Sequence, residues 1–145
     1  MPEHGAHVTY APHAPPVVVF DGVCVLCSRW VRFLLRHDRA GVLHFAAMQG
    51  DSGRALLRDA GLDPDDPVSF LFVRDGRATT DSDALIAVLS MLGVPWRLAA
   101  GALQGVPRSW RDAAYRRLAR SRYRWFGRRE ACLVPPPEVR ARFLP

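Results

Sequence analysis

Short apolar runs and amphipathic stretches alternate along this chain. Residues 17–20, Val-Val-Val-Phe, have the length and composition of a buried strand, and the turn-forming pair Asp21-Gly22 closes them. Residues 26–36 place apolar side chains on one broad face and arginines, at steps of three and four, on the other, which predicts an amphipathic helix. The same reasoning predicts a strand over residues 43–46 and a helix over residues 51–61.

The middle of the chain has the pattern of a hairpin followed by a helix. Asp75-Gly76 lies between the strand-like runs 68–73 and 78–80, and this dipeptide is a strong signal for a tight turn between antiparallel strands. A helix is expected over residues 83–92, with Ser82 as its N-cap.

The two ends of the chain differ from this middle part. Helices are expected over residues 96–103 and from Pro107, as the first helical residue, through Leu118. The prolines after Val134 are expected to end regular structure. Residues 1–16 are rich in proline and histidine, have neither the basic start nor the apolar centre of a secretion signal, and are expected to form a flexible tail.

The order of these elements predicts an α/β protein. A parallel strand-helix-strand unit, a helix, an antiparallel hairpin and a returning helix would form a central mixed sheet with helices on both faces. This three-layer order is the minimal thioredoxin-like layout. At 145 residues the chain is expected to hold one such domain, over residues 17–145, with a helical C-terminal extension from about residue 95.

Composition supports a globular chain with one basic segment. The hydrophobic fraction is 49%, and no apolar run approaches the roughly 20 residues of a membrane-spanning helix. Residues 108–142 hold eleven arginines against three acidic residues. Residues 120–129 interleave arginines with aromatic residues, so this segment is either a basic module for nucleic acid or an anionic surface, or a helix with solvated arginines. Nucleic acid is not the expected partner, whereas peripheral membrane contact stays open.

The sequence Cys24-Val-Leu-Cys27 carries the chemistry of the chain. Without an export signal the expected compartment is the reducing cytoplasm, where a close cysteine pair is more often catalytic or metal-binding than structural. Cys24 falls at the start of a predicted helix, where free backbone N–H groups and the helix dipole stabilise a thiolate. We therefore expect an accessible Cys24 to act as nucleophile and Cys27 to resolve the mixed disulfide, with no cofactor.

Other interpretations of the pair stay open. The two cysteines could be half of a zinc site, completed by Cys132 and His37 or His44, or they could be an inert buried pair. No metal is expected, because a second paired motif is missing from the sequence.

Neighbouring charges act on the pair in opposite directions. Arg29 could add positive charge near Cys24, whereas Asp21 opposes its thiolate unless that carboxylate is neutralised or accepts the proton of Cys27.

The motif Asp21-Gly22-Val23-Cys24-Val25-Leu26-Cys27 resembles that of the DCC family of predicted thiol-disulfide oxidoreductases. The resemblance continues, over residues 17–144 in all, through the segments Ser82-Asp83-Ala84, Pro107-Arg108, Asp112 to Tyr115, Arg122 to Gly127 and Cys132. It implies a thioredoxin-like fold and protein disulfide oxidoreductase activity. The substrate, which could be a protein or a small thiol or disulfide, does not follow from it.

Two further residues are candidates for the site. Pro67 precedes the third strand, where thioredoxin-like enzymes usually place a cis-proline facing the cysteines, although it could equally be an ordinary trans loop residue. The extension could simply anchor itself through large side chains such as Tyr115 and Tyr123. Alternatively, one of its arginines, with Arg122 the leading candidate, could pair with Asp21 and offset the effect of that carboxylate on the thiolate.

Overall fold

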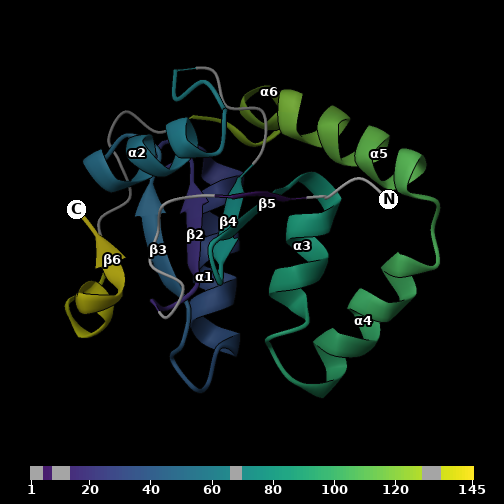
Figure 1. The fold of residues 1–145 in the computed structure, drawn as a ribbon, viewed down its shortest axis with the longest axis horizontal. Helices are drawn as coiled ribbons and strands as arrows, with labels where there is room; N and C mark the ends of the chain where they lie inside the picture. The colour runs from purple at the N-terminus through teal and green to yellow at the C-terminus, as the bar shows by residue number, and fades with distance from the viewer. Residues whose placement is uncertain (1–4, 8–13, 66–69, 129–134) are drawn as a thin grey trace.

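The computed structural model describes residues 5–7, 14–65, 70–128 and 135–145. Within these ranges six strands form one sheet in the order β1-β5-β4-β2-β3-β6 (Figure 1). The strands are β1 (Gly5–His7), β2 (Val17–Phe20), β3 (His44–Ala47), β4 (Leu71–Arg74), β5 (Arg77–Thr80) and β6 (Phe143–Leu144).

Strand β2 lies in the middle of the mixed sheet. It pairs in parallel with β3 and antiparallel with β4, which confirms the predicted strand-helix-strand unit and hairpin. The residues of β2 are at most 1% exposed, because helices cover both of its faces. The β4-β5 hairpin turns at Asp75 and Gly76, both with positive φ (52° and 75°), as the Asp-Gly signal predicted.

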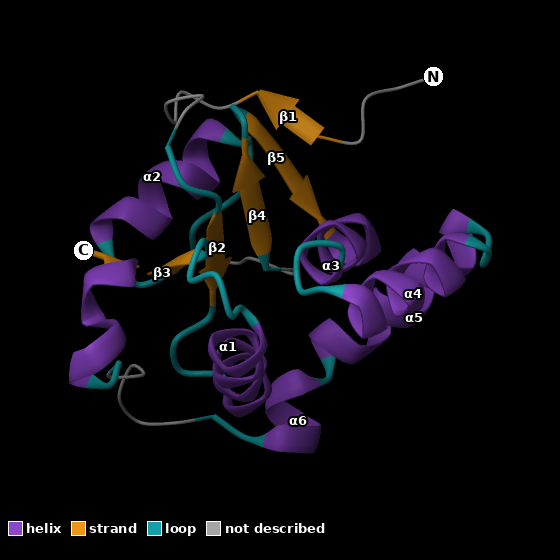
Figure 2. Ribbon diagram, turned by 90° about the horizontal axis from the view of Figure 1, so that it is seen from below, coloured by secondary structure: helices purple, strands orange, loops and turns teal. Residues whose placement is uncertain are grey.

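Helices cover the two faces of the sheet, so the predicted three-layer, thioredoxin-like arrangement is confirmed. Figure 2 shows α2 on one face and α1 with α3 on the other. The helices are α1 (Val25–His37), α2 (Asp51–Asp59), α3 (Asp81–Leu89), α4 (Val94–Gln104), α5 (Arg108–Arg120), α6 (Arg122–Phe126) and the 3-10 helix η1 (Pro137–Arg142). Helix α2 packs closely on the sheet at Gly53, where a Cβ atom would lie 2.0 Å from the carbonyl oxygen of Ala47.

The helical extension predicted from about residue 95 begins at α4. Helices α4 and α5 pack on α3, and α6 packs on α1, so the extension follows one face of the domain and ends beside the start of α1 (Figure 2). No helix in the described ranges combines the length and the apolar character needed to cross a membrane.

The prediction that regular structure ends after Val134 is wrong. The 3-10 helix η1 leads into β6, which pairs in parallel with β3. Phe143 stacks on Phe45 at a ring distance of 5.2 Å. Nη2 of Arg142 lies 2.6 Å from Oδ2 of the buried Asp38. These contacts join segments about a hundred residues apart, and they stabilise a strand that its local sequence does not predict.

The flexible tail expected over residues 1–16 also differs from the structure in one segment. Gly5–His7 forms β1 and pairs antiparallel with β5 at the edge of the sheet. Edge strands accept such additions because their outer N–H and C=O groups are otherwise unpaired.

Candidate active site

The two cysteines lie where the chain passes from the central strand β2 into helix α1. Cys24 is the N-cap of α1 in an extended conformation, and its Sγ accepts a hydrogen bond of 3.3 Å from the backbone N of Cys27. A sulfur atom thus takes the position that a serine or aspartate oxygen usually occupies at a helix N-terminus. The predicted placement of the pair at the strand-helix junction is confirmed.

The pKa values of the two thiols are shifted in opposite directions. The side chain of Cys27 donates a hydrogen bond to Cys24, and this contact outweighs burial and lowers the pKa of Cys24 to about 7. The backbone N–H of Cys27 and the charge of Arg122 act in the same direction, whereas Asp21 opposes them. The same hydrogen bond, together with burial and the adjacent negative charge of Cys24, strongly raises the pKa of Cys27. When the pair loses one proton, the negative charge therefore resides on Cys24.

Asp21 is the centre of a buried polar cluster just before the cysteines. The residue is 2% exposed. Its Oδ1 accepts hydrogen bonds from Nε2 of Gln49 at 2.8 Å and from the backbone N of Val23 at 3.1 Å. Its Oδ2 accepts the hydroxyl of Tyr123 and lies 3.3 Å from Nη2 of Arg122. Burial alone would raise the pKa of Asp21, but these donors and the arginine hold it below its usual value.

The predicted contact between Arg122 and Asp21 is therefore present. The interpretation of Asp21 as a proton acceptor for Cys27 is not favoured, because a carboxylate with a lowered pKa is a poor base. Arg29, the other cation considered, lies exposed on α1, and the named charges that act on the thiols are Arg122 and Asp21.

Gly22 and Gln49 fix the turn from the other side. The backbone N of Gly22 donates to Oε1 of Gln49 at 3.0 Å, so the amide of Gln49 contacts both residues of the Asp-Gly pair. The sequence analysis missed Gln49. It follows the end of β3, and the carboxyl ends of the parallel strands β2 and β3 meet at one edge of the sheet, which is the signal that could have found it.

The C-terminal extension also reaches the backbone at Cys24. Cys24 and Arg128 form an isolated antiparallel bridge, and the backbone N of Val25 donates to the carbonyl of Gly127 at 3.2 Å. Here the sequence-based expectation of an accessible nucleophile is wrong, because Cys24 is 0% exposed and Cys27 is the half-buried member of the pair. The part of the extension at Gly127 and Arg128, which lies more than a hundred positions from Cys24 in the sequence, accounts for this difference.

A cavity of about 170 Å³ lies beside Cys27. Apolar side chains of α1, α3 and α5, together with Phe70, form most of its wall, and Asp21 and Arg122 are among its lining residues. Cys24 does not line it. The cavity is therefore an approach to the pair through Cys27.

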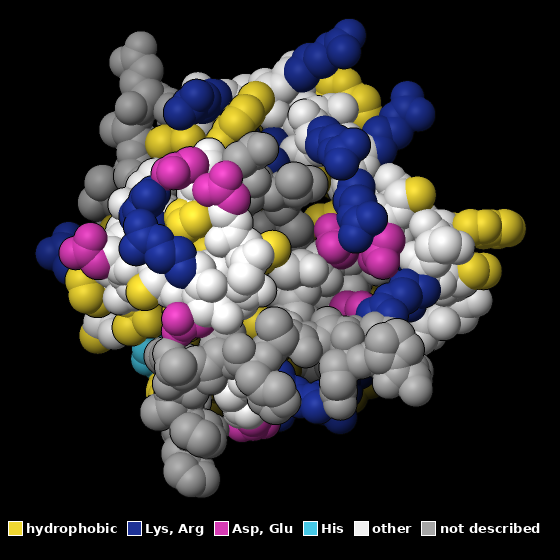
Figure 3. Space-filling model, turned by 45° about the horizontal axis from the view of Figure 1, so that its top comes forward, with side chains coloured by type: hydrophobic (Ala, Val, Ile, Leu, Met, Phe, Trp, Pro, Cys, Tyr) yellow, Lys and Arg dark blue, Asp and Glu magenta, His cyan; other side chains and the backbone are white. Residues whose placement is uncertain are grey.

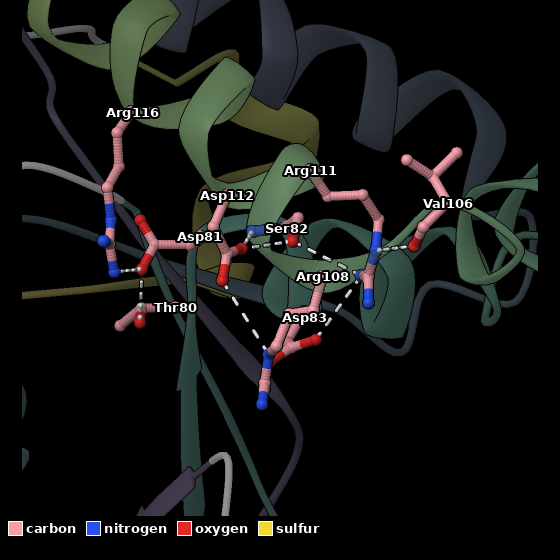
Figure 4. Close-up of polar contacts among 9 residues, drawn as sticks. All are labelled: Thr80, Asp81, Ser82, Asp83, Val106, Arg108, Arg111, Asp112 and Arg116. Atoms are coloured by element: carbon pink, nitrogen blue, oxygen red, sulfur yellow. Dashed lines mark hydrogen bonds and ion pairs between the residues drawn. The ribbon is translucent and has the colours of Figure 1, made fainter.

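A network of charged side chains holds α5 against the start of α3 (Figure 4). Ser82 donates its hydroxyl, and its backbone N at 3.3 Å, to Asp112, while Arg108 pairs with Asp83. Ser82 is thus not the N-cap that the sequence predicted. Thr80 has that position, since α3 begins at Asp81, and Ser82 instead donates to the carboxylate of Asp112. The network supports the wall of the cavity and, through α5, the position of α6.

The alternative site residues are placed as follows. His37 packs against the rings of Phe33 and Trp96, at centroid distances of 4.5 and 5.1 Å. In the described ranges, no three His, Cys, Asp or Glu side chains come together as metal ligands. Pro67 and Cys132 lie outside the described residues.

A cysteine pair that caps the first helix after a central strand of a mixed sheet is the arrangement of thioredoxin-like dithiol proteins. The model of the DCC1-like thiol-disulfide oxidoreductase family matches residues 18–128, and the chain belongs to this family. The resemblance seen in the sequence is thereby confirmed.

Two relatives extend this comparison. The chain is 41% identical over 129 residues to the uncharacterized protein YuxK of Bacillus subtilis (strain 168), covering 89% of this chain and 93% of that protein. It is 37% identical over 117 residues to the DCC family protein At1g52590, chloroplastic, of Arabidopsis thaliana, covering 81% and 68%. No solved structure matches the chain. The cytoplasmic location expected from the sequence stays a prediction.

Proposed function

We propose that this protein is a thiol-disulfide oxidoreductase that cycles between a Cys24–Cys27 dithiol and disulfide. The observation that carries the proposal is the position of the two thiols at a helix N-terminus, where Sγ of Cys24 accepts the backbone N–H of Cys27 and the pKa values of the two thiols are shifted in opposite directions. A thiol with a pKa of about 7 is half ionised near neutral pH, and Cys27 lies within hydrogen-bond reach of it. In exchange chemistry a thiolate attacks, or leaves from, a disulfide sulfur, and an acidic thiol is the better leaving group.

The cluster around Asp21 is proposed to position this chemistry without taking part in it. Arg122 favours the Cys24 thiolate through its charge, and Gln49 and Tyr123 keep Asp21 ionised and fixed. The cycle needs no bound cofactor, since the electrons pass between sulfur atoms.

A redox equilibrium tests the proposal. A Cys132→Ser variant, which leaves only the two motif cysteines, is incubated in glutathione buffers of stepped potential and analysed by mass spectrometry after alkylation. We expect one reversible two-electron transition that converts two alkylated thiols into an intramolecular disulfide. The single variants Cys24→Ser and Cys27→Ser in the same background are the matched controls and should form only mixed disulfides with glutathione. A pair that never closes a disulfide would overturn the proposal.

A second candidate function is binding of an anionic membrane surface by the helical extension. Among the described residues, Arg117, Arg120 and Arg124 are exposed and have no acidic partner, and Trp110 and Trp125 are 70% and 53% exposed. Figure 3 shows arginine side chains scattered over this face of the molecule, with hydrophobic and acidic side chains among them. Cationic and interfacial aromatic side chains together suit an anionic lipid surface.

Vesicle binding separates this second candidate from a merely basic surface. We expect binding to vesicles containing phosphatidylglycerol that weakens as salt is raised, and loss of binding in the triple variant Arg117→Gln, Arg120→Gln, Arg124→Gln. The control removes three exposed arginines of α1 by Arg29→Gln, Arg32→Gln and Arg36→Gln. The second candidate function would be contradicted if both triple variants weakened vesicle binding equally, or if the protein preferred single-stranded DNA over vesicles.

A further inference from the structure

The two sulfur atoms of the site differ in how a substrate can reach them. Cys24 is 0% exposed, and the backbone of Gly127 and Arg128 lies alongside it. Cys27 is half-buried and lines the cavity of about 170 Å³. A substrate that approaches the pair in this conformation therefore meets Cys27 first.

The cavity wall indicates what kind of group it accepts. Leu26, Trp30, Phe70, Leu85, Tyr115 and Leu118 contribute to the lining. The charged lining residues, Asp21 and Arg122, already bind each other at 3.3 Å. A ligand with several charges of its own would lose its hydration here without gaining matched partners.

The size of the cavity narrows this class further. An apolar cavity of about 150 Å³ is large enough to hold one benzene ring. The cavity beside Cys27, at about 170 Å³, therefore fits one aromatic ring or a branched aliphatic group of similar size.

The acidities of the thiols favour the same approach. In the oxidised pair, attack on Sγ of Cys27 expels Cys24, the sulfur whose negative charge the helix N-terminus and Arg122 stabilise. Attack on Cys24 would instead expel Cys27, which does not hold the N-cap position of α1.

We propose that the substrate is a small thiol bearing a compact apolar group, which occupies the cavity while its sulfur attacks Cys27. This inference rests on the proposed function and deepens it. The substrate thiolate forms a disulfide bond with Sγ of Cys27, the Cys24–Cys27 bond breaks, and Cys24 leaves as a thiolate. A second substrate thiolate then attacks the substrate sulfur of the mixed disulfide, releasing the substrate disulfide and Cys27, which takes up a proton. Two electrons pass from two substrate thiols to the protein.

The assignment of the mixed disulfide to Cys27 reverses the roles expected from the sequence. A local motif shows which sulfur lies at the helix N-terminus, but access depends on Gly127, Arg128 and α5, which are distant in the sequence.

The experiment uses the oxidised Cys132→Ser protein and two thiols of similar acidity, phenylmethanethiol and 2-mercaptoethanol. The reaction is quenched with acid at early times, and fragmentation between residues 24 and 27 locates the adduct by mass spectrometry. Each rate is divided by the rate of the same thiol with oxidised dithiothreitol, which removes differences in intrinsic reactivity.

We expect the adduct on Cys27. The normalised rate should be roughly tenfold higher for phenylmethanethiol, because the cavity buries its aromatic ring and 2-mercaptoethanol has no such group. The variant Leu118→Trp, which enlarges a side chain of the cavity wall, should bring the ratio of the two rates close to one. Leu98→Trp is the matched control, because Leu98 is 70% exposed on α4 and does not line the cavity, and it should keep the ratio.

Two results would overturn the inference while the proposed function stands. One is an adduct on Cys24 in an active protein, and the other is equal normalised rates for the two thiols. If neither thiol opens the disulfide at any concentration, and glutathione also fails, then the proposed function falls together with the inference.

Discussion

Nη2 of Arg122 lies 3.3 Å from Oδ2 of Asp21, although the two residues are 101 positions apart in the chain. Their side chains are 12% and 3% exposed, so the pair is largely withdrawn from water. It connects α6 to the turn before α1 and places one positive charge near both sulfur atoms. The helical extension is therefore part of the site as well as a covering of the domain.

Removal of this positive charge should make Cys24 less acidic. In Arg122→Ala the pKa of Cys24 should rise from about 7 by a fraction of a unit to about one unit, because one of the groups that favour the thiolate is lost. The ultraviolet absorbance of the thiolate, followed against pH, measures this directly. Arg122→Lys keeps the charge and should show a smaller rise. An unchanged midpoint in folded Arg122→Ala would show that Arg122 only anchors α6.

Loss of the phenol at position 123 should produce a destabilisation that depends on pH. Tyr123→Phe removes a hydrogen bond to the carboxylate of Asp21 and should lower the free energy of unfolding by about 1 kcal/mol at pH 7. The folded-state pKa of Asp21 is lowered, so its ionised form stabilises the protein above the unfolded pKa, and that contribution is lost as pH falls through the folded pKa. The difference between wild type and variant should therefore shrink below about pH 4. Denaturant unfolding at several pH values checks this, and a pH-independent difference would contradict the role given to Asp21.

The network between α3 and α5 should contribute more to stability than an exposed ion pair. Asp112→Asn weakens its contacts with Ser82 and Arg108, and we expect it to cost about 1–2 kcal/mol. Asp75→Asn is the matched control, because Asp75 is an exposed partner of Arg74 and asparagine tolerates its positive φ. The control should change stability by less than about 0.5 kcal/mol. Chemical denaturation of the two variants measures the difference, and equal effects would show that the network stabilises the protein no more than an exposed ion pair does.

The last strand should depend on one buried ion pair. Arg142→Ala leaves the carboxylate of Asp38 without its cation and should cost about 3 kcal/mol. Arg140→Ala removes an exposed arginine of the same 3-10 helix and should be nearly neutral. Thermal unfolding compares the two variants, and hydrogen exchange at β6 should accelerate in the first alone. A stable Arg142→Ala protein with a protected β6 would contradict this assignment.

The parts of the fold that follow from local sequence could be predicted. Strand β2, the Asp-Gly turn and the cysteines at the start of α1 are encoded by neighbouring residues, and the predicted bounds of β2 and α1 differ from the observed ones by at most one residue. The contact between Arg122 and Asp21 could also be predicted, because a carboxylate beside a thiolate calls for a compensating cation.

The remaining features depend on contacts between distant segments. No local pattern in Phe143–Leu144 indicates a strand. This strand, β6, forms because of contacts with the distant residues Phe45 and Asp38. Gln49 reaches the Asp-Gly pair only because β2 and β3 are parallel neighbours. The burial of Cys24 depends on a segment more than a hundred positions away, and a motif alone therefore gave the wrong accessible sulfur.

The catalysed rate of disulfide exchange tests the central claim most directly. The Cys132→Ser protein is compared with its Cys24→Ser/Cys27→Ser derivative in the glutathione-dependent oxidation and reduction of a peptide that contains one disulfide. We predict turnover well above the uncatalysed rate for the protein that keeps both motif cysteines, and the uncatalysed rate for the derivative that lacks them. Equal rates for the two proteins would show that the cysteine pair is not a redox centre and would contradict the account.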